Sequence, residues 1–163
     1  MNICLISREY PPETGWGGIG TYTYNLAHGL TEKGCNVHVI CQSLDVDKEC
    51  IDHRVYVHRV AHKTFFPFKG MFREFALRWE YSKSVYDKLK KIIKKHHIDI
   101  VEAPNFSGEG FIYSFHKKAP LVTRLHTDFS EVMNFWGWEN NIDRRLSQWF
   151  ETASILRSDI MIC

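Results

Sequence analysis

Apolar residues in the first part of this chain follow two patterns with different periods. Residues 3–6, Ile-Cys-Leu-Ile, form a short dense run with the length of a buried strand. Further on, Tyr22, Leu26 and Leu30 recur at every fourth position, which is the spacing of one face of a helix. Gly34 follows at a place where helices commonly end. The pattern therefore predicts a strand, a connection and a helix.

The same two patterns alternate to the end of the chain. We predict strands at residues 2–7, 36–41, 54–60, 98–102, 121–125 and 160–163. We predict helices at residues 20–34, 71–97, 111–117 and 141–157. Strands that alternate with helices are typical of a parallel sheet with helices on both faces. In such folds, ligands bind beyond the carboxyl ends of the strands.

Two of the predicted helices gather apolar residues on one face. The long helix carries Phe72, Phe75, Trp79, Tyr86, Leu89 and Ile93. The last helix carries Ile142, Leu146, Trp149, Ala153 and Leu156. We expect the apolar face of the long helix to pack against the sheet. Phe65, Phe66, Pro67 and Phe68, which precede that helix, are predicted to form a loop.

Composition and charge narrow the classes of protein that fit. The chain has 163 residues, enough for one domain, and a formal net charge of +2, which argues against a nucleic-acid binder. Lysines and arginines are concentrated in residues 69–95, where they outnumber the acids Glu74, Glu80 and Asp87. Such a run is typical of a solvated helix face, and peripheral contact with a membrane surface is the alternative.

Cysteine usage and hydropathy predict the compartment. The five cysteines are odd in number and form no Cys-x-x-Cys pair, which indicates a reducing environment. The first apolar run is too short for a signal peptide, and no segment approaches the roughly 20 apolar residues of a membrane-spanning helix. We expect a cytoplasmic protein, with the inner face of the membrane as a further option.

A glycine-rich segment joins the first predicted strand to the first helix. It reads Tyr-Pro-Pro-Glu-Thr-Gly-Trp-Gly-Gly-Ile-Gly over residues 10–20. A strand, a glycine-rich loop and a helix start together present bare backbone N–H groups to an anion. This predicts a site for a phosphate or a polar sugar.

The letters Gly15-x-Gly17-x-x-Gly20 match the dinucleotide fingerprint, but their context does not. In the fingerprint the first glycine follows the strand directly, whereas residues 8–14 intervene here. An acid should also end the second strand, and the first one after it is Asp45. No Gly-Lys-Ser or Gly-Lys-Thr follows, so a phosphate-loop NTPase fits less well still.

Motifs of another kind run through nearly the whole chain in order. They are Tyr10-Pro11-Pro12, Gly17-Gly18-Ile19-Gly20, Leu26-Ala27, Leu30, Gly34, Val37-His38-Val39, Asp99-Ile100-Val101-Glu102-Ala103-Pro104, Val122-Thr123-Arg124-Leu125-His126-Thr127 and Arg157-Ser158-Asp159. This combination resembles the N-terminal domain of family-4 glycosyltransferases, which have the GT-B fold. The resemblance implies an α/β, Rossmann-like three-layer sandwich with a mainly parallel sheet, one half of a GT-B fold.

The resemblance also implies a function for a longer protein. Residues 1–163 would be the N-terminal, acceptor-side domain of a retaining glycosyltransferase. A nucleotide sugar would be the donor, and a saccharide or a lipid-linked sugar, as in polysaccharide biosynthesis, the acceptor. The chain stops at Cys163 within an apolar run, so we expect a fragment whose C-terminal nucleotide-sugar-binding domain is absent and which is inactive alone. A natural edge strand at the terminus is the alternative.

Candidate site residues come from the segments at the predicted ligand edge. By resemblance, Gly17, Gly18, Ile19 and Gly20 lie where donor and acceptor meet, and their bare backbone suits close approach to a ligand. His126 is the candidate catalytic residue, because the resemblance implies that it contacts the transferred sugar.

Further candidates flank these residues. Asn105 and Phe106 would line the acceptor side of the cleft, and Thr127 and Asp128 are secondary candidates. Asp128 has an equal claim to be a helix N-cap or a turn residue.

Two other patterns have a structural interpretation beside a functional one. Glu102 and Glu109 could suggest a pair of catalytic carboxylates, but nothing in the sequence places them face to face, and Glu109 could cap the next helix. The aromatic residues Phe135, Trp136 and Trp138 could stack on a sugar, although core packing under the last helix is favoured.

No metal or other cofactor is expected. The adjacent pair His96-His97 lacks the spacing of metal ligands, and the resembling family relies on helix dipoles and basic residues instead of a cation.

Two rival functions stay open. One is a non-catalytic sugar- or partner-binding module of the same fold. The other is a nucleotide-sugar epimerase, which needs Tyr-x-x-x-Lys. Tyr86 and Lys90 match by letter, but they lie on the long helix.

Overall fold

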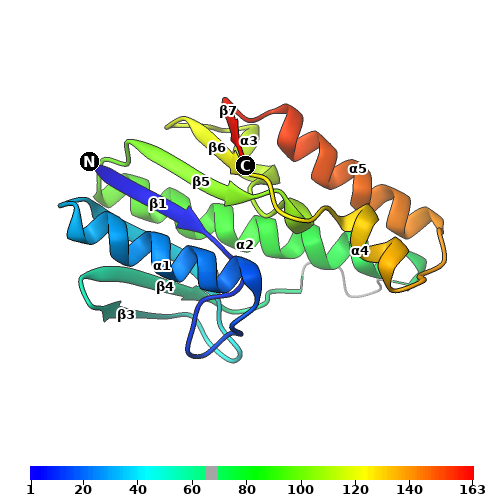
Figure 1. The fold of residues 1–163 in the computed structure, drawn as a ribbon, viewed down its shortest axis with the longest axis horizontal. Helices are drawn as coiled ribbons and strands as arrows, with labels where there is room; N and C mark the ends of the chain where they lie inside the picture. The colour runs from blue at the N-terminus through cyan, green and yellow to red at the C-terminus, as the bar shows by residue number, and fades with distance from the viewer. Residues whose placement is uncertain (65–69) are drawn as a thin grey trace.

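A seven-stranded, mainly parallel sheet organises the chain in the computed structural model, which describes residues 1–64 and 70–163 (Figure 1). The strands are β1 (Asn2–Ile6), β2 (Asn36–Gln42), β3 (Lys48–Asp52), β4 (Val55–Val60), β5 (Ile100–Pro104), β6 (Leu121–Arg124) and β7 (Ile160–Ile162). The helices are α1 (Gly18–Glu32), α2 (Arg73–Lys95), α3 (Phe111–Ser114), α4 (Phe129–Phe135) and α5 (Ile142–Leu156), with short 3-10 turns η1 (Gly70–Phe72) and η2 (Phe106–Gly108). The predicted loop of Phe65, Phe66, Pro67 and Phe68 lies outside the described residues.

The strand order is β3-β4-β2-β1-β5-β6-β7, and every pairing except β3 with β4 is parallel. From β1 the chain builds the sheet outward on one side through β2 and β4. It then returns to the other side of β1 and continues through β5, β6 and β7. In doubly wound sheets this reversal opens a crevice at the carboxyl ends of the central strands. The predicted Rossmann-like α/β architecture is confirmed.

Successive residues of β1 point to opposite faces of the sheet. Ile3 and Leu5 pack in a cluster with Ala27 of α1, whereas Cys4 and Ile6 pack in a second cluster with residues of α2. The two helices therefore cover opposite faces, as the strand period of two requires.

Two short elements were not predicted. β3 is exposed along most of its length, and its sequence, Lys-Glu-Cys-Ile-Asp, contains no apolar run. It forms because the turn at His53 and Arg54, both at positive φ, folds it back antiparallel onto β4. α4 is a seven-residue helix that begins after the N-cap Asp128, too short for a periodic signal.

The buried face of α2 differs in part from the predicted one. Tyr81, Val85, Leu89 and Ile92 lie in the core with side chains from the sheet. Of the six predicted residues, Leu89 belongs to this core. Tyr86 and Ile93 pack at its margin, and Phe72 is exposed.

The apolar residues predicted on one face of the last helix lie mainly on the surface. Ile142, Leu146, Trp149 and Leu156 are exposed, and α5 instead buries Asp143, Ser147, Phe150, Glu151 and Ser154. The buried acids have partners: Asp143 accepts hydrogen bonds of 2.8 Å from the N–H groups of Glu74 and Phe75, at the start of α2. The first N–H groups of a helix need acceptors, and Asp143 supplies them for α2. This requirement, and not the spacing of apolar residues, decides which face of α5 is buried.

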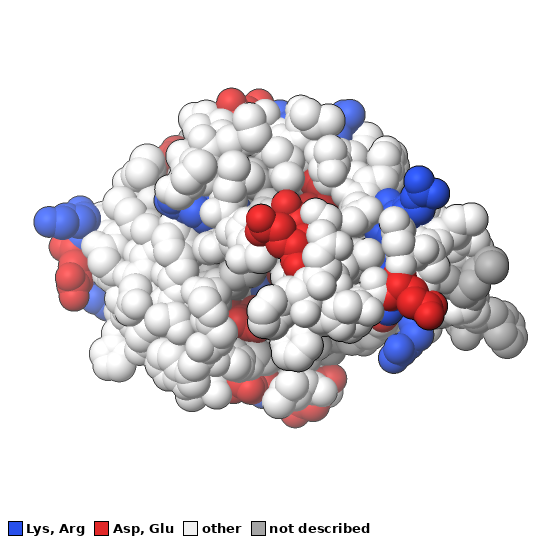
Figure 2. All heavy atoms as spheres, turned by 45° about the vertical axis from the view of Figure 1, so that its right-hand side comes forward, with Lys and Arg blue, Asp and Glu red and all other residues white. Residues whose placement is uncertain are grey.

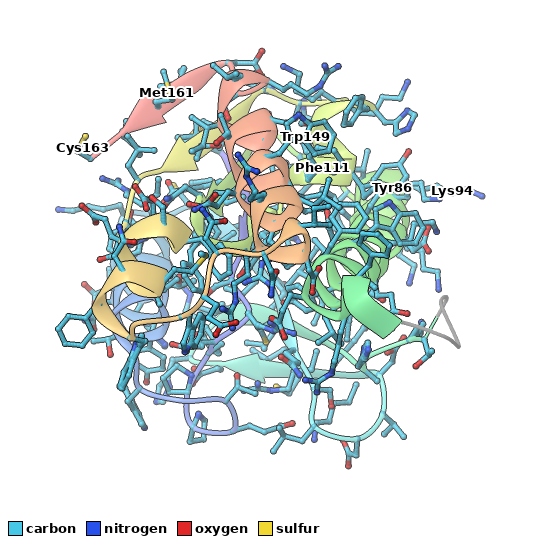
Figure 3. All side chains as sticks on the ribbon, turned by 90° about the vertical axis from the view of Figure 1, so that its right-hand side faces the viewer. Tyr86, Lys94, Phe111, Trp149, Met161 and Cys163 are labelled. Atoms are coloured by element: carbon cyan, nitrogen blue, oxygen red, sulfur yellow. The ribbon has the colours of Figure 1, made fainter. Side chains whose placement is uncertain are left out.

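The aromatic residues Phe135, Trp136 and Trp138 are also exposed, which corrects the favoured expectation that they pack in the core. With Ile142, Leu146, Trp149 and Leu156 they form an exposed surface that we call the α4–α5 apolar face. Figure 2, in which the side bearing α4 and α5 comes forward, shows broad uncharged areas there. In Figure 3, Trp149 lies beside Phe111 of α3, with ring centroids 5.9 Å apart.

Candidate functional site

The carboxyl ends of β1, β5 and β6 bring three predicted segments to one edge of the sheet. β1 leads into the glycine-rich segment, β5 into Asn105, and β6 toward His126. Tyr22, in the first half of α1, packs edge-on against the His126 ring at a centroid distance of 5.4 Å. The glycine segment and His126 are therefore neighbours in space, on the two sides of a shallow hollow that also involves Ile19 and Glu102.

The glycine segment leaves a helix start open. α1 begins at Gly18, and its N-cap Gly17 supplies no side-chain hydrogen bond. Within the described part of the chain, no hydrogen bond reaches the backbone N–H groups of Gly18, Ile19 and Gly20. Gly17 and Gly18 are exposed. Free N–H groups and the positive end of a helix dipole favour an anion or a polar oxygen at this place.

Glu9, which the sequence reasoning missed, explains two of the glycines. A Cβ built on Gly17 would overlap Oε2 of Glu9, and one built on Gly20 would lie 2.8 Å from the Glu9 Cβ. A Cβ on Gly18 would meet nothing within 4 Å. Gly17 and Gly20 therefore make room for a carboxylate of the protein itself, and Gly18 alone leaves open space toward the solvent. The sequence indicates this contact only by placing an acid, Glu9, a few residues before the glycine-rich loop.

Tyr10 anchors the connection that precedes the glycines. Its side chain is buried, and its hydroxyl donates to Asp52 Oδ2 at 3.2 Å. The backbone carbonyl of Tyr10 accepts a 3.0 Å hydrogen bond from Arg59, whose guanidinium also pairs with Glu13 at 3.2 Å. Burial, followed by the charge of Asp52, raises the pKa of Tyr10. The loop is thus tied to β3 and β4 before it reaches the ligand edge.

His126 is partly buried, and its backbone is fixed by Asn105. The N–H of His126 donates to Asn105 Oδ1 at 2.7 Å, and Asn105 Nδ2 donates to the His126 carbonyl at 3.4 Å. Neither ring nitrogen of His126 has a hydrogen-bond partner among the described residues. Burial, with a contribution from nearby Arg124, lowers the pKa of His126, so the neutral ring is favoured.

Asn105 is itself held by a buried carboxylate. Its Nδ2 donates to Glu151 Oε1 at 3.1 Å, and the same carboxylate accepts from the N–H groups of Phe129 and Ser107 at 3.1 and 3.0 Å. Burial raises the pKa of Glu151 to about 7. Asn105 is only 1% exposed, so its side chain positions His126 and is not open to a ligand.

Tyr22, Glu102 and Arg124 form a second polar group beside His126. The Tyr22 hydroxyl donates to Glu102 Oε1 at 2.9 Å, and Arg124 Nε lies 3.6 Å from the same oxygen. The Arg124 guanidinium also lies over the Tyr22 ring, 4.9 Å from its centroid. Burial and the charge of Glu102 raise the pKa of Tyr22 to about 12. The sequence reasoning counted Tyr22 only as part of the apolar face of α1 and missed the hydrogen bond of its hydroxyl to Glu102.

The remaining predicted residues have different surroundings. Thr127 is exposed, and Phe106 is partly buried with its ring 6.4 Å from that of Phe129. Asp128 is the N-cap of α4 and accepts a 2.7 Å hydrogen bond from the N–H of Glu131. The hydrogen bonds from Ser130 and Glu131 lower the pKa of Asp128.

Glu109 does not cap the next helix. The N-cap of α3 is Gly110, and Glu109 Oε2 instead accepts a 2.9 Å hydrogen bond from the N–H of Arg8. Its side chain is 3% exposed, and burial raises its pKa to about 8. Glu102 and Glu109 bind different partners, so they do not act as a carboxylate pair.

The Tyr-x-x-x-Lys pair of the epimerase alternative lies away from this site. Tyr86 and Lys90 lie on the C-terminal half of α2, on the way to the amino end of β5 and away from the glycine segment. Within residues 1–64 and 70–163, no group of three His, Cys, Asp or Glu side chains could hold a metal ion. In the same ranges, no helix is long and apolar enough to span a membrane.

Comparison with known proteins identifies relatives at the level of family and fold. A family model described as Glycosyltransferase Family 4 matches residues 16–163. No match is found among curated proteins.

Among solved structures, sucrose-phosphate synthase from Thermosynechococcus elongatus is similar, with a TM-score of 0.66, 16% identity, and coverage of 98% of this chain and 41% of that one. The catalytic domain of starch synthase IV from Arabidopsis thaliana, solved with ADP and acarbose, is also similar, with a TM-score of 0.57, 15% identity, and coverage of 77% of this chain and 34% of that one. At this identity the structures establish the fold, and the chain spans well under half the length of either neighbour.

Proposed function

This chain belongs to glycosyltransferase family 4, and we propose that it is the acceptor-side domain of a retaining glycosyltransferase that moves a sugar from a nucleotide-sugar donor to a saccharide or lipid-linked acceptor. The observation that carries the proposal is the position of His126 next to a helix start with free N–H groups. Transfer from a nucleotide sugar builds negative charge on the leaving diphosphate. Hydrogen-bond donors that are already oriented stabilise such charge without reorganisation.

Each residue of the site has a separate role in the proposed transfer. The N–H groups of Gly18, Ile19 and Gly20 donate hydrogen bonds to the negatively charged leaving group or to a polar group of the acceptor, and Gly17 lies at the helix start. His126 contacts a hydroxyl of the transferred sugar through a ring nitrogen. Asn105 is a positioning residue that acts through the backbone of His126.

Three further parts of the proposal concern the whole protein. A C-terminal domain, beyond residue 163, binds most of the nucleotide sugar, so this domain alone has little or no activity. No metal ion takes part. The protein works in the cytoplasm and can reach the inner face of the membrane through exposed lysines of α2, namely Lys90, Lys91, Lys94 and Lys95.

The test uses a longer protein that includes the sequence after residue 163. A panel of UDP-, GDP- and ADP-sugars is supplied with saccharide acceptors, and release of nucleoside diphosphate is measured with and without EDTA. We expect turnover with one donor class, no loss on chelation, and a fall of about 100-fold or more for His126→Ala. His97→Ala, an exposed histidine just after α2, is the matched control and leaves the rate unchanged.

Two outcomes count against the proposal. Clear turnover by residues 1–163 alone overturns the two-domain arrangement. A longer protein that binds sugars but turns over no donor favours the second candidate, a non-catalytic partner-binding module. The α4–α5 apolar face is the observation that favours this candidate, because a large exposed apolar patch commonly marks a protein contact.

A further inference from the structure

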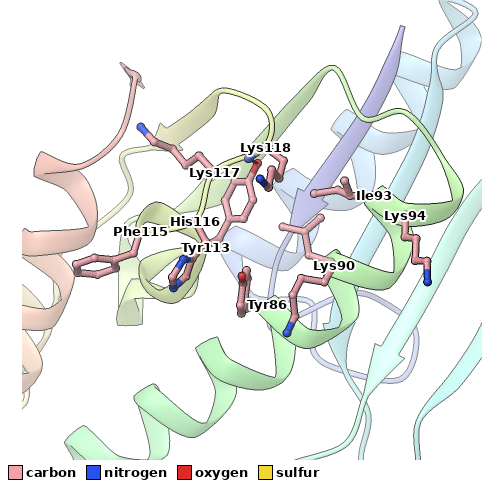
Figure 4. Close-up of a pocket in the computed structure, with 10 residues that line it drawn as sticks. Tyr86, Lys90, Ile93, Lys94, Tyr113, Phe115, His116, Lys117 and Lys118 are labelled. Atoms are coloured by element: carbon pink, nitrogen blue, oxygen red, sulfur yellow. Dashed lines mark hydrogen bonds between the residues drawn. The ribbon is translucent and has the colours of Figure 1, made fainter.

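A groove of about 650 Å³ lies between the C-terminal half of α2 and the segment after α3 (Figure 4). α2 ends before the amino end of β5, and residues 113–118 precede the amino end of β6. The groove is therefore toward the opposite end of the strands from Gly18 and His126. Figure 3 shows Tyr86 and Lys94 on the other side of the molecule from Met161 and Cys163.

Of the charged residues that the structure describes along this groove, all are lysines, and none is an acid. Lys90 and Lys94 come from α2, and Lys117 and Lys118 from the segment after α3, together with His116. Lys90 is paired with Asp87 at 3.0 Å, and Lys117 with Asp159 at 2.6 Å.

Two of the lysines are uncommitted. The ammonium groups of Lys94 and Lys118 have no ion pair or hydrogen bond with any residue that the structure describes. Two unpaired ammonium groups at one groove attract an anion, and compact doubly charged phosphates gain most from such a pair.

The floor of the groove is aromatic and aliphatic. The Tyr86 ring stacks on His116 with centroids 5.3 Å apart and 26° between the planes. Leu89 and Ile93 extend this surface along α2. Such a floor suits a ring or a short carbon chain next to the anionic group.

The segment that carries the cations is fixed in place. The buried Tyr113 hydroxyl donates to the carbonyl of Ala119 at 2.7 Å and accepts from the N–H groups of Lys118 and Ala119 at 3.2 and 2.9 Å. In Figure 4, His116 and Lys118 lie near Tyr113 and Tyr86, whereas Lys117 and Phe115 point away from them. A fixed segment lowers the entropic cost of binding.

We propose that this groove is a binding site for a phosphate ester, separate from the transfer site. The phosphate contacts Lys118 and His116, Lys94 adds its positive charge from the other side of the groove, and the carbon part of the ester lies on Tyr86 and Ile93. The ester could be a soluble molecule or the head group of an anionic phospholipid, and both offer the same chemistry to the groove.

The first arm of the test uses soluble probes on the ¹⁵N-labelled 163-residue chain. Phenyl phosphate and inorganic phosphate are titrated while amide resonances are followed. We expect phenyl phosphate to shift residues 86–94 and 113–118 and to bind more tightly than inorganic phosphate. Lys94→Gln/Lys118→Gln should weaken binding by about tenfold or more, because the groove loses one charge-assisted contact and a second nearby positive charge.

The second arm measures sedimentation with vesicles of phosphatidylglycerol or of phosphatidylcholine. If the ligand is a lipid head group, the chain sediments with the anionic vesicles only, and the double variant stays in solution. Lys33→Gln/Arg145→Gln removes the same charge from exposed positions that do not line the groove, and it should behave as the parent in both arms.

The outcomes separate cleanly. Binding in either arm that depends on Lys94 and Lys118 supports the site. The arm in which it occurs shows whether the ligand is a soluble ester or a lipid head group. No binding in both arms, an equal loss in the control variant, or shifts confined to the glycine segment overturns it. Equal affinity for phenyl phosphate and inorganic phosphate, or an unchanged affinity for phenyl phosphate in Tyr86→Leu, overturns the role of the aromatic floor.

Discussion

The side chain of Asn105 makes two hydrogen bonds to the backbone of His126. Oδ1 lies 2.7 Å from the His126 backbone nitrogen, and Nδ2 lies 3.4 Å from the His126 carbonyl oxygen. Asn105 follows β5 and His126 lies just beyond β6, so this contact joins the ends of two neighbouring strands. Asn105 is buried, whereas His126 remains partly exposed at the ligand edge of the sheet.

Asn105→Ala should destabilise the fold and displace His126. The change leaves the His126 N–H without its partner and removes one of the three hydrogen bonds to the Glu151 carboxylate, which costs about 1–3 kcal/mol. Urea unfolding measures this cost, and the His126 ring resonances report the displacement. Asn134→Ala, at an exposed position on α4, is the control and should change neither. Equal stability of the two variants would contradict the positioning role.

Alanine at the three glycines should give three different results. Gly20→Ala lowers the free energy of unfolding by about 1–3 kcal/mol, since its Cβ meets Glu9 and the Gly15 carbonyl. Gly17→Ala costs less, because it meets the mobile end of the Glu9 side chain. Gly18→Ala leaves stability unchanged or raises it by about 0.5 kcal/mol, because its Cβ points into open space.

Activity should rank these variants differently. In the longer protein, Gly18→Ala should reduce transfer although it unfolds normally, because the new methyl group occupies the approach to the free N–H groups. Thermal unfolding and the transfer rate are measured on the same samples. A stable Gly18→Ala variant with full activity would remove the ligand role of this glycine.

Glu109 should make the fold less stable as the pH rises. Its folded pKa is raised to about 8 from an ordinary value near 4.5, so between these values the folded state holds a proton that the unfolded state has lost. Its contribution is fully present below about pH 4.5 and is lost as the pH rises to 8, by at most about 1.4 kcal/mol per pH unit.

The comparison of Glu109→Gln with the parent isolates this effect. Glutamine keeps an oxygen for the Arg8 N–H but does not titrate, so its stability relative to the parent should increase from pH 5 to pH 8. Burial lowers the pKa values of His38 and His58, which act in the opposite direction below about pH 6.5 and cancel in this difference. Glu139→Gln, at an exposed position, is the control for the substitution itself.

Substitution of two neighbouring residues of α5 should destabilise the fold by very different amounts. Phe150 is fully buried and packs on Phe111 at a centroid distance of 3.9 Å, so Phe150→Ala should cost about 3–5 kcal/mol. Trp149 is 55% exposed, and Trp149→Gln should cost less than about 1 kcal/mol. Chemical unfolding of both variants is the measurement. A larger cost at Trp149 would mean that the α4–α5 apolar face is covered in solution.

Much of the fold followed from local pattern. The runs at β1, β2 and β5 are dense enough in apolar residues to specify buried strands, and the period of α1 specified a helix. β3 and α4 escaped prediction because one is an exposed polar edge and the other is shorter than two helical periods. The family followed from motif order, and it is confirmed by the match over residues 16–163.

The candidate site followed only in outline. The alternation of strands and helices determined that the glycine segment, Asn105 and His126 reach one edge of the sheet, because parallel strands end together. The sequence also predicted a helix from residue 20, preceded by glycines with a bare backbone, whereas the structure begins α1 two residues earlier, at Gly18. Which side chains face a ligand and which support others depends on contacts between residues far apart in the chain.

Tertiary structure alone decided those contacts. It buried Asn105 behind His126, placed Glu9 against Gly17 and Gly20, and turned the polar side of α5 inward, where Glu151 meets the backbone of Ser107. A periodic pattern records how apolar residues are spaced, but buried N–H groups must also be paired, and that requirement is met by whichever acceptor the fold brings near. Spacing is a property of the sequence, whereas hydrogen-bond pairing across elements exists only once they have packed.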